Sequence, residues 1–446
     1  MAQISPARKA AFEILRTLDR GQAHSDDLLR GKAVSALAPQ DRNLATALVL
    51  GVLRWQLALD QSIRPLLKRP NAKLDTEVLI ALRLGAFQLR HFDRIPAHAA
   101  IDESVELTRQ SGHRFATGMV NAVLRKLATP QNQSDASALE SSRALQAYPQ
   151  WMRDRWESFF GAEEACSICV QGQAQPPLTL RIGAEMELTE LAAAGIALEH
   201  GAMVSRARIA VSGDVTATSA FRDGRVRIQD EGSQLVAEIA GEGSRILDCC
   251  AAPGGKTLIL AERNPQSRIV ACEASPQRLE AMRKRLLSLA DRVECRLADA
   301  TAFSDESVYD LVLADVPCSG TGTLGRNPEI RHRLKPEDLP RQAERQIAIL
   351  EQALRAVRIG GRVVYSTCSL EPEENEQVVA AVLQRNANTR VIPLRARLDQ
   401  MRTAGILTAQ GAVRLQACLT PEGYLRLFPG ALGTDGFFVA MLEKME

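Results

Sequence analysis

The stretch RILDCCAAPGGKT, Arg245 to Thr257, decides the fold, because a short apolar run passes directly into two glycines and the start of a helix. The apolar run has the length and composition of a buried β-strand. Gly254 and Gly255 let the backbone approach a ligand closely, and the helix that follows presents free N–H groups at its start. We therefore predict a cofactor-binding turn at the carboxyl end of a strand.

The same alternation of strand and helix patterns continues toward the C-terminus. Four further apolar runs end in polar turns, with a helical segment after the first run and a long one between the last two: RIVACE (268–273), VECRLAD (293–299), YDLVLADVP (309–317) and GRVVYSTCS (361–369). Such alternation predicts a mostly parallel, doubly wound sheet, in which ligands bind beyond the carboxyl ends of the strands. YLRLFPG and DGFFVAML, within residues 424–442, predict an antiparallel pair at the edge of this sheet, whereas residues 388–420 suggest no role.

The N-terminal part of the chain has a different pattern. In ARKAAFEILRTL and DRNLATALVLGVLRW, apolar residues recur at i, i+3 and i+4, which predicts amphipathic helices. We expect an all-α domain over residues 1–140, with a small polar linker at 128–142. Strand patterns such as LTLRIG and RVRIQ, mixed with helices, then predict a small α/β domain over residues 141–235, before the doubly wound domain of residues 236–446.

Positive charge is concentrated in the helical part. The whole chain has 55 Lys and Arg against 53 Asp and Glu, whereas residues 1–130 have 19 against 12. A basic helical domain favours a polyanionic partner such as nucleic acid. A merely solvated basic surface gives the same count, so charge alone leaves both interpretations open.

Composition limits the class of protein. A chain of 446 residues, 46% of them apolar, can bury a large core in two or three domains. Its start has no apolar leader with a cleavage site, and LATALVLGVL is too short to cross a bilayer, so we expect a cytoplasmic protein with no membrane partner. Its nine cysteines should then be thiols. Cys166 and Cys169 have metal-site spacing, but they lack a second pair or a nearby histidine, and we expect no metal site.

The identity of the cofactor depends on the residues around the turn. GGKT resembles the end of a nucleoside triphosphatase phosphate loop, but Cys250 stands where that loop needs glycine, and Pro253 removes an N–H. Glu273 lies about 20 residues beyond the turn, where a carboxylate accepts both hydroxyls of a ribose. Asp299 ends the next strand and suits an adenine amino group. A glycine turn with two acidic strand ends fits a nucleoside without phosphate, and we expect S-adenosylmethionine.

Two cysteines follow strands of the predicted sheet. DVPCSGTGTLGRNPEIR begins at Asp315, and STCS ends the next strand, so Cys318 and Cys368 should open onto the same cleft. A thiolate that adds to carbon-6 of a pyrimidine makes carbon-5 nucleophilic toward a methyl sulfonium, and a second group must then remove the carbon-5 proton. Asp315 is placed to hydrogen-bond the ring nitrogen and amino group. From this chemistry alone the two cysteines could exchange roles.

Glutamates crowd the residues after Cys368, in SLEPEENE. Negative charge beside a thiol raises its pKa, which does not suit a reactive cysteine. Pro372 fits the first position of a helix, in which Glu373, Glu374 and Glu376 would complement the helix dipole. We therefore expect these carboxylates to serve the helix and to point away from the sulfur.

Taken together, these motifs resemble the RNA 5-methylcytosine methyltransferases of the Sun family. DCCAAPGGKT, DVPCSGTGTLGRNPEIR and STCSLEPEENE are similar to three signatures of that family in order, and RVRIQDEGSQLVA and GTDGFFVAML match further patterns. This resemblance covers roughly residues 145–446. In the helical part, DRNLATALVLGVLRW, LGAFQLRHFDRIPAHAAIDESVEL and FATGMVNAVLRKL resemble NusB, an RNA-binding helical fold, which favours the family member that acts on 16S ribosomal RNA.

The resemblance implies a Rossmann-like class I methyltransferase domain, preceded by a NusB-like domain and a small RRM-like α/β domain. It makes Cys368 the nucleophile, while Cys318, near Asp315, helps to release the product. Glu273 stands where family members often have aspartate, and its longer side chain should still reach the ribose. The cofactor-binding positions then fall on Cys250, Ala251, Ala252, Pro253, Gly254, Gly255, Lys256, Glu273, Asp299 and Asp315.

Substrate and partners are also implied by the resemblance. We expect 16S ribosomal RNA, naked or at an early stage of assembly, to be methylated at carbon-5 of one cytosine by a monomeric enzyme. Two alternatives remain open from the sequence. The chain could methylate another RNA such as tRNA, or it could be a non-catalytic RNA-binding factor with a relic cofactor domain.

Overall fold

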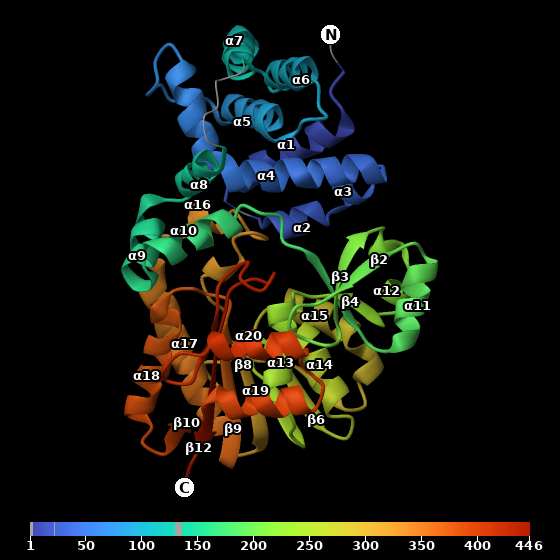
Figure 1. Cartoon of the computed structure of the whole chain (residues 1–446), viewed down its shortest axis with the longest axis vertical. Coiled ribbons are helices and arrows are strands. Elements are labelled where there is room, and N and C mark those ends of the chain that lie inside the picture. Colours follow the sequence, from blue (N-terminus) through green and yellow to red (C-terminus); the bar gives the residue numbers. More distant parts are fainter. Residues whose placement is uncertain (1–2, 22, 130–135) are drawn as a thin grey trace. The chain divides into compact units, whose positions relative to one another are not determined.

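The computed structural model describes residues 3–21, 23–129 and 136–446 (Figure 1). The chain forms two compact units, and their division is not a single cut in the sequence. One unit contains the residues up to Gln175 together with Leu324–Leu334. The other contains Pro176–Thr323 and Lys335–Glu446.

The first unit is helical, as the apolar periodicity of its sequence predicts. Its core is formed by the buried faces of five helices, α1 (Pro6–Asp19), α4 (Pro39–Ile63), α5 (Thr76–His91), α6 (Ala97–Gln110) and α7 (Thr117–Leu127). Helices α4 and α5 pack closely because Gly51 has no side chain: a Cβ atom there would lie 2.0 Å from the ring of Phe87. Short helices α2 (Ser25–Leu29) and α3 (Lys32–Ser35) connect α1 to α4.

The helical unit continues beyond the boundary predicted at residue 141. Helices α8 (Ala136–Gln146), α9 (Gln150–Phe160) and α10 (Ala162–Gln171) belong to it, so the grouping of the chain differs from the predicted small domain of residues 141–235. The linker predicted at residues 128–142 lies partly outside the described residues, and from Ala136 onward it is helical. The strands predicted for the small domain begin only at Leu178.

A segment from the C-terminal half of the chain completes the helical unit. Leu324–Leu334, which includes α16 (Ile330–Arg333), carries the buried side chain of Arg331. The Arg331 guanidinium lies 4.0 Å from the ring centroid of Tyr148 and donates hydrogen bonds to the carbonyl oxygens of Arg54 (3.1 Å), Gly172 (3.3 Å) and Leu324 (3.3 Å). This cation supplies the donors for carbonyl groups that have no access to water.

The second unit begins with a small antiparallel sheet. Its strands β1 (Leu178–Ile182), β2 (Ala197–His200), β3 (Ala207–Ser212) and β4 (Val226–Ile228) lie in the order β2-β3-β1-β4. Helices α11 (Glu185–Ala193) and α12 (Ser219–Arg222) pack against the sheet. The shared core contains the buried side chains of Leu180, Ile182, Leu191 and Val226.

The larger sheet has the predicted class I methyltransferase topology. Its main path runs β10-β12-β9-β8-β5-β6-β7, with β9, β8, β5, β6 and β7 parallel. The antiparallel pair predicted within residues 424–442 is present as β11 and β12, but β12 is an internal strand, since β10 extends the sheet beyond it. The strands are β5 (Arg245–Asp248), β6 (Arg268–Glu273), β7 (Val293–Leu297), β8 (Tyr309–Asp315), β9 (Val357–Thr367), β10 (Thr389–Val391), β11 (Leu425–Leu427) and β12 (Phe437–Lys444).

Helices cover both faces of this sheet (Figure 1). Alternate residues of each strand point to opposite faces, so Leu311 and Leu313 of β8 belong to one core and Val312 and Ala314 to the other. The first face packs against α13 (Glu231–Ala240), α14 (Gly255–Arg263), α15 (Pro276–Arg285), α19 (Leu394–Thr403) and α20 (Ala409–Ala417). The second packs against α17 (Asp338–Ala356) and α18 (Glu376–Arg385).

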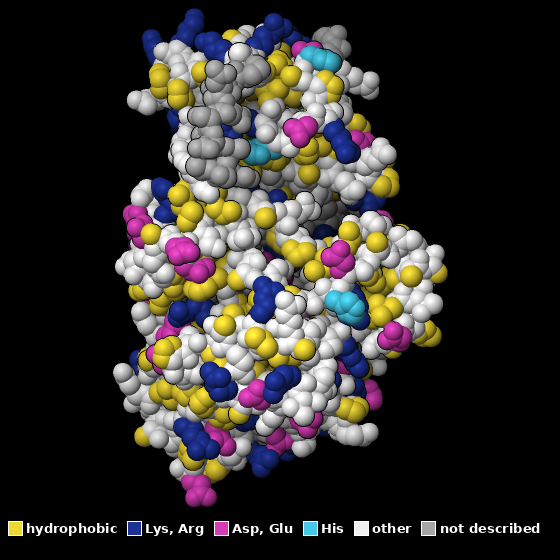
Figure 2. Space-filling view, viewed as in Figure 1, with side chains coloured by type: hydrophobic (Ala, Val, Ile, Leu, Met, Phe, Trp, Pro, Cys, Tyr) yellow, Lys and Arg dark blue, Asp and Glu magenta, His cyan; other side chains and the backbone are white. Residues whose placement is uncertain are grey.

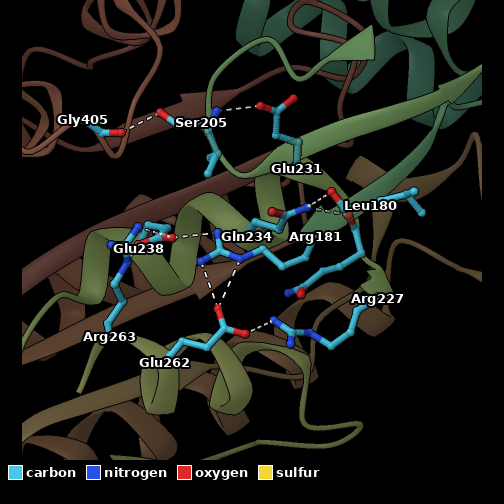
Figure 3. A network of polar contacts seen from close by, with 12 residues as sticks. Leu180, Arg181, Ser205, Arg227, Glu231, Gln234, Glu238, Glu262, Arg263 and Gly405 are labelled. Atoms are coloured by element: carbon cyan, nitrogen blue, oxygen red, sulfur yellow. Dashed lines mark hydrogen bonds and ion pairs between the residues drawn. The ribbon is translucent and has the colours of Figure 1, made fainter. Parts of the chain in front are cut away.

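A network of buried charges attaches the small sheet to the helices of the larger domain (Figure 3). Arg181 of β1 pairs with Glu238 of α13 at 2.8 Å and with Glu262 of α14 at 3.1 Å. Arg227 of β4 pairs with the same Glu262. These contacts join β1 and β4 of the small sheet to α13 and α14.

Within the described residues, no helix combines the length and the apolar character that crossing a membrane would require.

Replacing Arg331 with leucine should lower the free energy of unfolding by roughly 3 kcal/mol, because several buried carbonyl groups would lose their donor. Arg333→Leu is the matched control on the same helix, since Arg333 donates to one carbonyl, that of Leu18 at 3.2 Å, and should cost roughly 1 kcal/mol or less. Urea unfolding followed by circular dichroism measures both. Equal losses in the two variants would contradict this role of Arg331.

Candidate active site

The polar residues predicted to bind ligand lie at the carboxyl ends of the parallel strands. Strand β8 ends at Asp315, and its partner in β9 is Ser366, whose hydroxyl donates to Asp315 Oδ1 at 2.7 Å. Lys256, near the start of α14, donates from Nζ to Asp315 Oδ2 at 2.7 Å. The Asp315 carboxylate thus joins three segments that are far apart in the sequence.

The structure brings the two predicted cysteines together. The Sγ atoms of Cys318 and Cys368 lie 3.4 Å apart, within hydrogen-bonding distance for thiols. Their turns are also joined through the backbone, because the Gly322 N–H donates to the Cys368 carbonyl at 2.9 Å and the Gly436 N–H donates to the Gly322 carbonyl at 2.8 Å. A Cβ atom on Gly322 would lie 2.4 Å from the carbonyl oxygen of Gly436. Only glycine fits at this crossing.

The glycine turn after β5 forms one wall of a cavity. Gly254 has φ +94°, a conformation that side chains disfavour, and Gly255 starts α14. The cavity has a volume of about 150 Å³. Its lining combines predicted and unpredicted residues: Arg227, Ile228, Gln229, Ser233, Asp248, Cys250, Ala251, Ala252, Pro253, Gly255, Lys256, Arg285 and Asp315.

Three side chains of this lining have polar atoms that a ligand would satisfy. Arg227 Nε, Gln229 Oε1 and Asp248 Oδ1 are buried and have no hydrogen-bond partner among the described residues. Burial raises the pKa of Asp248 to about 7, with the Asp315 carboxylate adding to the rise and the Thr257 hydroxyl, 2.7 Å from Asp248 Oδ2, opposing it. The cavity therefore suits a ligand with its own donor groups.

The acids predicted to hold the ribose and adenine lie at the same edge but do not line this cavity. Glu273, at the end of β6, accepts from the Ser275 N–H at 2.8 Å and pairs with Arg278 at 3.3 Å. Asp299 follows β7 and is exposed, and the Thr301 backbone N–H, 2.9 Å away, lowers its pKa. Both carboxylates are held by neighbouring N–H groups at the ends of adjacent strands.

The expectation for the glutamates after Cys368 is wrong for Glu374. Pro372–Glu374 forms a 3-10 turn, and α18 begins only at Glu376. The Glu374 carboxylate is fully buried and accepts hydrogen bonds from the Ser319 N–H (2.8 Å), the Ser319 hydroxyl (2.5 Å), the Ser369 hydroxyl (2.5 Å) and Gln346 Nε2 (2.9 Å). Since Ser319 and Ser369 each follow a cysteine, Glu374 fastens the two cysteine turns to each other.

The thiol of Cys318 is held in its protonated form. The hydrogen bond with Cys368 is the main cause that raises the pKa of Cys318 well above its usual value, and burial and the Glu374 carboxylate add to it. The Asp315 carboxylate, through its charge and its hydrogen bond, raises the pKa of Lys256 although burial alone would lower it. The two cysteines are therefore not equivalent in their surroundings.

Several residues of the site carried no role in the sequence analysis. Arg227, Gln229 and Ser233 lie in RVRIQDEGSQLVA, a segment that matched a family pattern without suggesting a function. Asp248 lies inside the strand pattern, and Glu374 was obscured by its neighbouring glutamates.

Cys166 and Cys169 lie on α10, and within the described ranges no group of three or more side chains could hold a metal ion.

Comparison with known protein families identifies both parts of the chain. Residues 238–443 match the family model described as 16S rRNA methyltransferase RsmB/F, and residues 5–129 match the NusB family model. The chain is 33% identical to the probable ribosomal RNA small subunit methyltransferase B of Bacillus subtilis, with 98% of each protein covered. It is 32% identical to the ribosomal RNA small subunit methyltransferase B of Pseudomonas putida, again with 98% of each covered.

Solved structures share the fold. The crystal structure of PH0851 superposes with a TM-score of 0.78 at 23% identity and covers 99% of this chain and 100% of that protein. The structure of NSun6 from Pyrococcus horikoshii with SFG has a TM-score of 0.54 at 19% identity, and the match covers 67% of this chain and 98% of that protein.

Replacing Glu374 with glutamine should separate the cysteine turns, because the amide nitrogen would face donors such as the Ser319 N–H. We expect the free energy of unfolding to fall by about 1–3 kcal/mol and disulfide formation between Cys318 and Cys368 under a mild oxidant to slow. Peptide mass spectrometry measures the disulfide. Glu376→Gln, which loses one ion pair with Arg426, is the control and should leave the oxidation rate unchanged.

Asp248→Asn should make stability less dependent on pH. The pKa of Asp248 rises from 3.8 in the unfolded chain to about 7, so its contribution to stability is full below about pH 4 and is lost as the pH rises to 7. The variant should exceed the unaltered protein in stability at pH 8, and the difference should shrink toward pH 5. Asp299→Asn should instead be less stable than the unaltered protein at pH 8, because the pKa of Asp299 is lowered in the folded protein. Thermal unfolding at several pH values checks both.

Proposed function

Because this chain belongs to the RsmB/F family of 16S rRNA methyltransferases, we propose that it methylates carbon-5 of a cytosine in 16S ribosomal RNA through a covalent cysteine adduct. The observation that carries the proposal is the pair of thiols 3.4 Å apart, next to a cavity formed by the glycine turn and Asp315. A methyltransferase that acted on a nitrogen or a ribose hydroxyl would need no such pair of thiols.

The residues that line the cavity suit S-adenosylmethionine, which supplies an electrophilic methyl group when bound. The residues of the glycine turn from Cys250 to Lys256 form one wall, and the unsatisfied oxygens of Gln229 and Asp248 can accept from its amino groups. Glu273 and Asp299, at the neighbouring strand ends, remain our proposed partners of the ribose and adenine.

Cys368 is the proposed nucleophile. Its thiolate adds to carbon-6 of the cytosine, and the electron pair of the 5,6 double bond becomes available at carbon-5 for attack on the methyl group. Asp315 positions the base by accepting from its amino group and by holding, against the ring nitrogen, the proton that neutralises the charge developed on the ring during attack, while Lys256 and Ser366 hold the Asp315 side chain in place. Loss of the carbon-5 proton then restores the double bond and expels the Cys368 thiolate.

Cys318 is the proposed base for this last step. Its contact with Cys368 is the main cause of its raised pKa, so consumption of the Cys368 thiolate in the adduct should lower the pKa of Cys318. Cys318 can then lose its proton to solvent and take up the proton from carbon-5. These reaction steps assign different roles to the two adjacent thiols and require neither thiol to change position.

The target cytosine must be unpaired or flipped out, because attack on carbon-6 needs access to the face of the ring. RNA sequence is read best in loops and splayed bases, so we propose that the helical unit and the small sheet bind structured RNA around the site. We further propose a monomeric enzyme that acts on naked or early-assembly RNA.

Substituting the cysteines separately tests their roles. Cys368→Ala should abolish the covalent complex with a cytosine-containing 16S rRNA fragment, whereas Cys318→Ala should let the complex accumulate, because release is blocked. A denaturing gel with labelled RNA measures the complex, and Cys418→Ala, which removes a half-buried thiol outside the site, is the control. Accumulation by Cys368→Ala instead would reverse the assignment.

Bisulfite sequencing of total RNA from cells with and without the protein tests the substrate. A cytosine of 16S rRNA should lose its methylation in the cells without the protein. Loss of a tRNA methylation instead would retain the chemistry but replace the substrate, and no change in any RNA would favour a non-catalytic binding factor.

A further inference from the structure

A second polar pocket lies within the helical unit, apart from the residues of the proposed active site. It is lined by one face of α4, the C-terminal end of α5 and part of α8, with Trp55, Ser62, Arg90, His91, Arg143 and Gln146 among its side chains. Trp55 and Ser62 are two turns apart on α4 and therefore share one face of that helix.

Two arginines contribute positive charge to this pocket. Arg90 and Arg143 line the same pocket, and burial, together with the charge of Arg143, lowers the pKa of Arg90. Arg90 Nη1 donates to the hydroxyl of Ser62 at 2.6 Å. Across the described part of the chain, neither arginine forms an ion pair with a carboxylate, in contrast to Arg83 of the same helix α5, which binds Asp60 at 2.6 Å. Repulsion between two such groups is relieved when an anion binds between them.

The wall of the pocket is a stack of rings. His91 lies between Trp55, at a centroid distance of 4.7 Å, and Phe87, at 4.8 Å. Burial, together with Arg90 and Arg143, lowers the pKa of His91 to about 4, so the imidazole is neutral at neutral pH. The stack fixes the last turn of α5, which carries Arg90, and leaves the two arginines as the source of positive charge.

We propose that this pocket binds a backbone phosphate of the RNA substrate. A guanidinium presents planar pairs of N–H donors that match phosphate oxygens, and two guanidinium groups with the Gln146 amide supply enough donors for one phosphodiester. The choice of RNA as the source rests on the proposed function. It is supported by the excess of positive charge in residues 1–130 and by the Lys and Arg side chains gathered at the end of the helical unit that carries α6 and α7 (Figure 2).

A phosphate contact of this kind orients the RNA without reading its sequence. The pocket would therefore contribute to affinity and to the register of the RNA on the helical unit. The rate of methyl transfer in the bound complex would not depend on it.

The double variant Arg90→Gln/Arg143→Gln tests this proposal with a 16S rRNA transcript. We expect roughly 10-fold weaker binding, since hydrogen bonds to a charged group are lost. The slope of log Kd against log salt between about 50 and 200 mM should fall by about 1. Arg16→Gln/Arg30→Gln removes the same charge from arginines of the helical unit that are already paired with Glu13 and Asp26, and should leave the slope unchanged.

Further measurements separate the possible outcomes. Arg143→Lys, which keeps the charge but loses the planar donors, should retain the salt slope and weaken binding only partly. At saturating RNA, the single-turnover rate of methyl transfer should equal that of the unaltered protein. Equal losses of RNA affinity in the two double variants would overturn the proposal. So would unchanged RNA affinity in Arg90→Gln/Arg143→Gln, even if the unaltered protein binds inorganic phosphate tightly. An unaltered protein that binds RNA through these arginines but transfers no methyl group would contradict the proposed function alone.

Discussion

The buried carboxylate of Glu374 is the interaction on which the proposed active site depends. An ionised side chain without access to water is tolerated only if hydrogen bonds replace its hydration, and here four donors do so. Because two of these donors belong to Ser319 and one to Ser369, the requirement to satisfy one carboxylate also brings Cys318 and Cys368 into contact. The contact with Cys368 is the main cause that raises the pKa of Cys318, and burial and the Glu374 carboxylate add to it.

Charged side chains hold the remaining parts of the site in the same manner. Asp315 is held by Lys256 and Ser366, and the small sheet is held by Arg181 and Arg227, which share the carboxylate of Glu262. Each of these contacts joins elements that are distant in the sequence. Lys256, Asp315 and Arg227 from these contacts line the cavity beside the glycine turn, and the unsatisfied oxygens of Gln229 and Asp248 remain available to a ligand.

The loop that carries Cys318 also belongs to both units of the protein. Residues up to Thr323 lie in the unit that contains the sheet, and Leu324–Leu334 lies in the helical unit, where Arg331 is buried. Covalent continuity thus connects the helical unit to a cysteine turn within a few residues. The helical unit therefore contains a segment from the part of the chain that otherwise forms the sheet-containing unit.

The sequence by itself determined the strands, the glycine turn, the two cysteines and the family, because these depend on residue types at short, regular spacings. It did not predict the extent of the helical unit to Gln175 or the place of β12 inside the sheet, since both depend on pairing with distant segments. It also misplaced Glu374, because a glutamate after a proline has the same local pattern whether it caps a helix or is buried. Only the tertiary structure decided which of these carboxylates is buried. Burial of Glu374 depends on hydrogen-bond donors from the turn at Ser319, and that turn is separated from Glu374 in the sequence by α17 and β9.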